Sequence, residues 1–222
     1  MADYCVIDRQ QLEEDLISVA DAIREKAGSE QMLSFPEGFV QTVDSIRVGD
    51  GHDAEDGILS GGLSGDYVND RITRLNSYCL AYRSAVCTYH FPAVLSMVSY
   101  VFNSNTGATV IELPALTSLQ GGNFAGCSSL KRVDLGMVSS LGWSATFPNC
   151  TVLKELILRS SSVAELGNVN FFNGTPFAQG GSGGRVYVPS ALIESYQKAT
   201  NWSALYGYGT CEFVALEGSD YE

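Results

Sequence analysis

Few residues of this chain have the type and spacing that catalysis or metal binding needs. The sequence has two His and six Cys, and no two Cys have the Cys-x-x-Cys spacing typical of a zinc site. Cys87 and His90 come nearest to a thiol–imidazole pair, but at this spacing on a strand their side chains point to opposite faces. We therefore expect a protein that is not an enzyme, with no catalytic residue, no cofactor and no metal ligand.

An acidic, glycine-rich segment over residues 48–65 is the other candidate for cation binding. Its carboxylates lie around His52, but their order lacks the alternating ligands and the closing Glu of a calcium loop. We expect this segment to be a linker with a solvent-exposed His52.

Composition excludes several classes of partner. The chain has 13 Lys and Arg against 25 Asp and Glu, a formal charge of −12, which repels phosphate backbones and anionic lipid surfaces. No apolar run approaches the roughly 18 residues of a membrane span, and the first residues lack the regions of a signal peptide. We expect no nucleic-acid partner, no membrane insertion and no signal peptide.

The elements that position the remaining candidates begin with residues 1–47, which we expect to form a helical hairpin. One helix is predicted over residues 8–27, and a second begins after Ser34, with Pro36 in its first turn. Both share an apolar stripe at helical spacing, formed by Leu12, Leu16, Val19, Ile23, Phe35, Phe39 and Val43. The stripe fits a hairpin packed on itself. Its spacing in the first helix also fits a symmetric bundle in a homo-oligomer.

From about Ile72 the chain repeats itself every 22 or 23 residues. Two apolar positions with one residue between them recur, at Tyr89/Phe91, Ile111/Leu113, Val133/Leu135, Leu156/Leu158 and Val186/Val188. Such pairs predict short strands. One short coil cannot bury its own apolar face, so we expect successive coils to stack into a parallel sheet. We expect a short helix and a plug at Trp202 to close the last coil.

Three phrases carry a resemblance to known families. Cys127-Ser-Ser-Leu-Lys-Arg-Val-Asp-Leu resembles the turn and strand of BspA-like leucine-rich repeats, and the likeness covers about residues 72–188. The segment from Tyr187 to Tyr206 is similar to the C-terminal cap of such arrays in phage-encoded proteins. The segment from Leu16 to Ile46 is similar to the front of many phage tail and other virion structural proteins. The first two coils depart from the pattern, with Arg83 and Asn105 at the position of Cys127.

The residue patterns and the resemblance together predict an α+β chain. Residues 1–47 would be an anchoring helical hairpin, residues 48–65 an acidic linker, and residues 66–222 a short leucine-rich-repeat solenoid of stacked parallel strands. A helical cap would begin at about residue 188.

The same resemblance implies a phage virion protein of the tail, baseplate or fibre, assembled in the host cytoplasm. Its hairpin would bind other virion proteins, and its repeats would bind a protein or a glycan of the host surface. Two alternatives stay open: a purely architectural virion protein without receptor binding, and a bacterial BspA-like surface adhesin, which would need an export signal.

If alternate strand residues face inward, two columns of side chains face outward from the sheet. The first column is His90, Glu112, Asp134, Ile157 and Tyr187, and the second is Thr88, Val110, Arg132, Glu155 and Arg185. Aromatic and Arg side chains are common anchors in recognition sites, so these columns are the candidate binding surface, with a plain solvated face as the alternative. A rival site lies in the aromatic loops around Tyr78, Tyr82, Tyr100 and Trp143, whose rings core packing would also explain.

The cysteines are too dispersed for the disulfide framework of a small secreted domain. Cys127 and Cys150 occupy equivalent positions of adjacent coils, with Cα atoms expected about 5 Å apart, which is within disulfide range. We nevertheless expect buried free thiols, because a small side chain fills a tight inward turn well.

Overall fold

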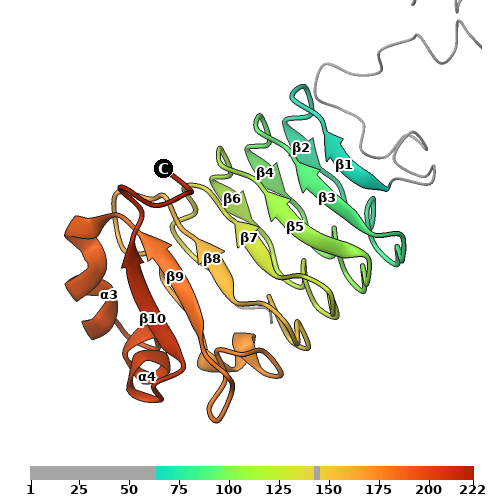
Figure 1. The fold of residues 1–222 in the computed structure, drawn as a ribbon. Helices are drawn as coiled ribbons and strands as arrows, with labels where there is room; N and C mark the ends of the chain where they lie inside the picture. The colour runs from blue at the N-terminus through green and yellow to red at the C-terminus, as the bar shows by residue number, and fades with distance from the viewer. Residues whose placement is uncertain (1–63, 143–145) are drawn as a thin grey trace, which may run out of the picture. The chain divides into compact units, whose positions relative to one another are not determined.

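A computed structural model describes residues 64–142 and 146–222 of the chain. These residues form two parallel sheets, one of seven strands and one of three. Along the first coils the chain alternates between the two sheets, and successive strands of each sheet lie side by side (Figure 1). Each coil therefore stacks on the one before it.

The bounds of the elements are as follows. The large sheet contains, in spatial order, β1 (Gly65–Val68), β3 (Cys87–His90), β5 (Ala108–Glu112), β7 (Arg132–Asp134), β8 (Glu155–Ile157), β9 (Gly184–Val188) and β10 (Cys211–Ala215). The small sheet contains β2 (Arg74–Leu75), β4 (Ser96–Met97) and β6 (Ser118–Leu119). The short helices are η2 (Val169–Phe172), η3 (Ser190–Leu192), α3 (Ile193–Lys198) and α4 (Trp202–Gly207).

The register of the large sheet follows the sequence repeat. Ile111 pairs with Val133, and Val133 pairs with Leu156, so that each residue lies beside its equivalent in the next repeat. Leu156 in turn pairs with Val186, across the glycine-rich insertion. The apolar pairs predicted to form the core are all fully buried: Tyr89/Phe91, Ile111/Leu113, Val133/Leu135, Leu156/Leu158 and Val186/Val188. That prediction is confirmed.

A column of phenylalanine rings runs through the stacked coils. Phe102, Phe124, Phe147 and Phe172 are fully buried, and their centroids lie 5.8, 5.2 and 5.3 Å apart in succession. Neighbouring rings are inclined by 14°, 10° and 19°, which is the offset-stacked geometry that aromatic pairs favour. Each ring thus covers the ring of the coil before it.

A polar side chain at one turn position hydrogen-bonds the preceding coil. The Sγ atoms of Cys127 and Cys150 donate to carbonyl oxygens of the preceding coil at 3.0 and 2.9 Å. Asn105 occupies the same position one coil earlier, and its Nδ2 donates to the carbonyl oxygen of Leu80 at 2.8 Å. Both cysteines are buried free thiols, as the sequence predicts. The neighbouring Cys127 side chain and burial raise the pKa of Cys150, so that the thiol remains protonated.

The C-terminal end of the stack is covered by α3 and α4 (Figure 1). Trp202 of α4 is fully buried, and its Nε1 donates to the carbonyl oxygen of Ala164 at 2.7 Å. The hydroxyl of Tyr196 accepts from the backbone N–H of Ala164 at 2.9 Å. After these helices the chain adds one more strand, β10, which pairs in parallel with β9 and which the sequence analysis does not anticipate.

The predicted fold class, α+β, is wrong for the described part of the chain, although the stacked parallel strands predicted with it are present. This part is mainly parallel sheet, and its two α-helices have six residues each. The physical reason is that apolar residues with a period of two dominate this region and specify strands. None of the described helices is long or apolar enough to cross a membrane.

The predicted hairpin, residues 1–47, and almost all of the predicted linker lie outside the described residues. The same holds for the anchoring stripe of Leu12, Leu16, Val19, Ile23, Phe35, Phe39 and Val43.

We predict that Phe124→Ala lowers the free energy of unfolding by about 3–5 kcal/mol, because it opens a cavity in the middle of the ring column. Chemical denaturation of the full chain measures this change. Leu95→Ala is the control, since Leu95 is 51% exposed and its truncation should cost no more than about 0.5 kcal/mol. Equal effects of the two substitutions would contradict the role of the ring column.

Candidate functional site

The outward face of the large sheet carries the predicted columns in register. His90 pairs with Glu112, Glu112 with Asp134, and the same column continues through Ile157 to Tyr187. The second column runs through Thr88, Val110, Arg132, Glu155 and Arg185. The structure extends it at both ends, to Asp66 and Glu212. Thr88 donates a short hydrogen bond to Asp66.

The face differs between its two halves. Near β3 and β5 the side chains of His90 and Glu112 are 29% and 31% exposed. On β7, β8 and β9, by contrast, Asp134, Ile157 and Tyr187 are 4%, 1% and 7% exposed. The expectation that all five residues of the first column face solvent therefore needs correction. These three residues are buried because the C-terminal segment covers them. The sequence repeat does not predict this cover.

The segment Leu216–Glu222, which we call the tail, turns back from β10 over this face (Figure 1). Leu216 and Tyr221 pack with Ile157 and Tyr187 in a small apolar cluster. The ring of Tyr221 meets that of Tyr187 edge-on, with centroids 4.7 Å apart. The guanidinium of Arg132 lies 4.8 Å from the centroid of the Tyr221 ring, which is within cation–π range.

Polar contacts fix the tail at both ends of Tyr221. Its hydroxyl donates to Glu155 at 3.0 Å, and its carbonyl oxygen accepts from Nη2 of Arg159 at 2.7 Å. Arg159 also forms an ion pair with the buried carboxylate of Asp134 at 2.7 Å. Burial raises the pKa of Tyr221, with Arg132 opposing this shift and Glu155 adding to it. The hydroxyl therefore stays protonated at neutral pH and can donate to Glu155.

On the more open half, Glu112 joins two basic side chains. One carboxylate oxygen lies 2.6 Å from Nδ1 of His90, and the other accepts from Nη2 of Arg132 at 2.5 Å. Because Arg132 also contacts the ring of Tyr221, this chain of contacts connects the open half of the face to the tail.

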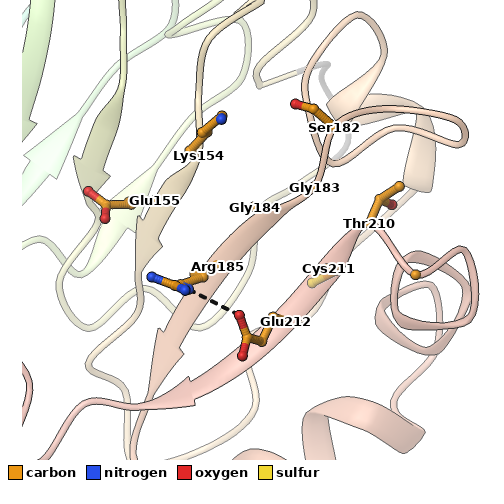
Figure 2. Close-up of a pocket in the computed structure, with 10 residues that line it drawn as sticks. Lys154, Glu155, Ser182, Gly183, Gly184, Arg185, Thr210, Cys211 and Glu212 are labelled. Atoms are coloured by element: carbon orange, nitrogen blue, oxygen red, sulfur yellow. Dashed lines mark hydrogen bonds and ion pairs between the residues drawn. The ribbon is translucent and has the colours of Figure 1, made fainter.

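A groove of about 450 Å³ lies at the ends of β8, β9 and β10 where these strands begin. In it Arg185 lies between Glu155 and Glu212, and its Nε donates to Glu212 at 3.0 Å (Figure 2). Ser182 and Thr210 line the groove beside several glycines, and Lys154 adds a second cation (Figure 2). The groove thus offers donors and acceptors of both charges on a backbone open to close approach.

A second groove, of about 330 Å³, lies beside the tail. Its lining includes Glu112, Arg132 and Arg159 from the coils, with Tyr221 and Glu222 from the tail. Because the Tyr221 hydroxyl bonds Glu155, which lines the first groove, Tyr221 is in contact with walls of both.

The donors and acceptors that line the two grooves suit hydrogen bonding to a polar ligand.

The thiol and imidazole that come nearest to a catalytic pair lie apart. Cys87 is fully buried and His90 faces outward, so the two side chains lie on opposite faces, as their spacing predicts. Burial raises the pKa of Cys87, which disfavours the reactive thiolate. Within residues 64–142 and 146–222, no three His, Cys, Asp or Glu side chains are grouped to hold a metal ion.

The residues that the sequence analysis missed come from outside the repeat. Tyr221 and Glu222 belong to the tail, which has no counterpart in other coils. Glu212 belongs to β10, for which the alternation of buried Cys211 and Phe213 was an available signal.

The rival aromatic site is partly described. Tyr78, Tyr82 and Tyr100 are 51%, 69% and 43% exposed, so core packing does not explain these rings. Trp143 lies outside the described residues.

Comparison of the chain with protein families, curated proteins and solved structures found no match.

We predict that Tyr221→Ala releases the tail, because the substitution removes the contacts with Tyr187, Arg132 and Glu155. Amide hydrogen exchange in residues 216–222 should then be at least tenfold faster, while exchange in β8 stays slow. Tyr221→Phe should give an intermediate rate, since it removes only the hydroxyl contact. Tyr208→Ala, at another exposed tyrosine, is the control. Unchanged exchange in Tyr221→Ala would show that this side chain does not hold the tail.

Proposed function

We propose that this chain is a structural protein of a phage virion, in the tail, baseplate or fibre, that binds other molecules through the outward face of its large sheet. Its N-terminal region anchors it to other virion proteins, and it acts by binding rather than by catalysis. The three sequence phrases that resemble phage virion proteins and BspA-like repeats support the virion assignment.

The observation that carries the binding role is a ladder of alternating charge across four adjacent strands. Arg132, Glu155, Arg185 and Glu212 follow one another at paired positions of β7, β8, β9 and β10. Arg185 and Glu212 form an ion pair, and Arg132 and Glu155 are each bonded to another side chain of the same face. The ladder is therefore a fixed array of donors and acceptors.

The composition of the groove favours a polar, hydroxylated ligand or a protein loop. Arg185 is 58% exposed and Glu212 65% exposed at the side chain, so both remain accessible while they pair with each other. A ligand hydroxyl can accept from the guanidinium and donate to the carboxylate at the same time. The net charge of −12 disfavours strongly anionic ligands.

A purely architectural virion protein is the competing proposal. In that case the sheet face would be buried against neighbouring subunits, and the purified chain would not bind host cells. Binding of the purified full chain to the bacterium on which the phage grows separates the two proposals.

We predict that Arg185→Ala slows adsorption of phage particles to host cells about tenfold, because a charged hydrogen-bond donor in the groove is worth roughly 1.5 kcal/mol or more. Arg74→Ala is the matched control, since Arg74 is an exposed arginine on the small sheet. Adsorption rates of particles carrying each variant give the comparison. If Arg185→Ala particles adsorb as fast as Arg74→Ala particles, the first groove is not the recognition surface.

A second prediction concerns anchoring by residues 1–47. Leu12→Asp with Ile23→Asp should remove the chain from purified particles, because two charges interrupt the apolar stripe that a partner would cover. Gln10→Asp with Ser18→Asp adds the same charge at positions outside the stripe and should leave incorporation intact. Quantitative immunoblots of purified particles measure the result. Equal incorporation of both variants would contradict anchoring through this stripe.

A further inference from the structure

Three tyrosines form an exposed stack on the turns of the first coils. The rings of Tyr78 and Tyr100 lie 5.3 Å apart and are inclined by 10°. The rings of Tyr78 and Tyr82 lie 6.4 Å apart and are inclined by 5°. Tyr82 is the most exposed of the three, at 69%, so most of its ring faces solvent.

The backbone at these tyrosines is unfavourable for a bulky residue. Tyr78, Tyr82 and Tyr100 have φ values of 62°, 58° and 66°, in the left-handed region that costs a residue with a Cβ roughly 1–2 kcal/mol. Later coils place other residue types at the equivalent positions. Gly122 stands one repeat after Tyr100, and Asn149 continues the series that begins at Tyr82. The turn itself therefore does not require an aromatic residue.

Strained backbone at exposed aromatic residues is more typical of recognition sites than of scaffolding. Stacking between rings offsets part of the strain, since an aromatic pair contributes about 0.5–1.5 kcal/mol. Stacking does not explain why the rings lie outside the core. Their exposure and their strain together indicate a role for the rings in binding.

The neighbouring coil leaves room for the stack. A Cβ atom at Gly122 would lie 2.5 Å from Cε1 of Tyr100, which is too close for the ring to keep its position. Any residue larger than glycine would displace the ring. The tyrosine in one coil and the glycine in the next thus act as a unit.

The described segment that carries the stack is poor in acidic residues. In a chain with 25 Asp and Glu, Glu112 is the only acidic residue between Asp70 and Asp134. The turns that carry the tyrosines also carry amides and hydroxyls such as Asn103 and Gln120. The backbone carbonyl oxygen of Asn103 accepts from the backbone N–H of Tyr82 at 3.0 Å, so the two turns lie side by side.

We propose that Tyr78, Tyr82 and Tyr100 bind an uncharged glycan of the host surface, at a second site on the turns of the first coils; this inference rests on the proposed function only for the source of the glycan. The C–H bonds of a sugar ring carry slight positive charge and meet the negative face of an aromatic ring favourably. Nearby amides bond the sugar hydroxyls.

The size of the stack favours a sugar over a protein. Three tyrosines of about 200 Å² each, half exposed, offer roughly 300 Å². A stable protein interface needs about 800 Å² per partner. The smaller area matches a few sugar residues.

The test uses the purified full chain on an array of neutral hexose and N-acetylhexosamine oligosaccharides, with heparin as an anionic probe. The key variant is Tyr78→Gly with Tyr82→Asn, which copies the residue types of later coils. It should unfold at or above the wild-type temperature, because Gly and Asn tolerate the left-handed backbone, and yet bind at least tenfold more weakly. Tyr78→Phe with Tyr82→Phe should bind within about threefold of wild type. Tyr208→Asn, at an exposed tyrosine elsewhere, should bind normally.

Three results would overturn the inference: a wild-type chain that binds none of the neutral oligosaccharides, binding to heparin alone, or unchanged binding in the Gly/Asn variant. The inference and the proposed function can fail separately. If purified phage particles do not contain the protein but the purified chain binds the glycan, the virion assignment is wrong and the tyrosine site stands. Particles that carry the Gly/Asn variant and adsorb normally would reject the tyrosine site while the virion assignment stands.

Discussion

The structure depends on one constraint: a single coil is too short to bury its own apolar side chains, so each coil must lie on the next in fixed register. The buried phenylalanine column is the clearest result, since Phe124 packs between Phe102 and Phe147 at 5.8 and 5.2 Å. Register then determines the outside as well as the inside. Because side chains alternate along a strand, fixing the inward residues also fixes which polar residues align on the outer face.

The same constraint explains why one turn position holds different residue types in successive coils but keeps the same hydrogen bond to the preceding coil. Asn105 and Cys127 differ in chemistry, and the sequence alone marks Asn105 as a departure from the repeat. In the structure both donate to a carbonyl oxygen of the preceding coil, at 2.8 and 3.0 Å. The position therefore accepts either an amide or a thiol, because both are small donors that reach the carbonyl oxygen of the preceding coil.

Periodicity predicted the elements that repeat and missed those that do not. The core pairs and the alignment of both outward columns could be read from spacing, because stacking forces equivalent residues of successive coils together. The burial of Ile157 and Tyr187 could not, because it arises from Tyr221, a residue distant in the sequence with no counterpart in the other coils. The predicted fold class was wrong for the described part because that part is mainly sheet, with two α-helices of six residues each.

The coil stack therefore has two kinds of surface. Toward β8 and β9 the tail covers the sheet, and Arg159 of the Asp134–Arg159 ion pair also donates to the Tyr221 carbonyl oxygen. Toward the first coils the face is more open, and the turns display tyrosines in strained conformations. Strain of this kind persists only where the surrounding structure over-determines the backbone, and the in-register stack of coils supplies that support. Without neighbouring coils, these turns could not keep three exposed tyrosines in the left-handed region. The regular packing of the core therefore allows strained residues at the surface.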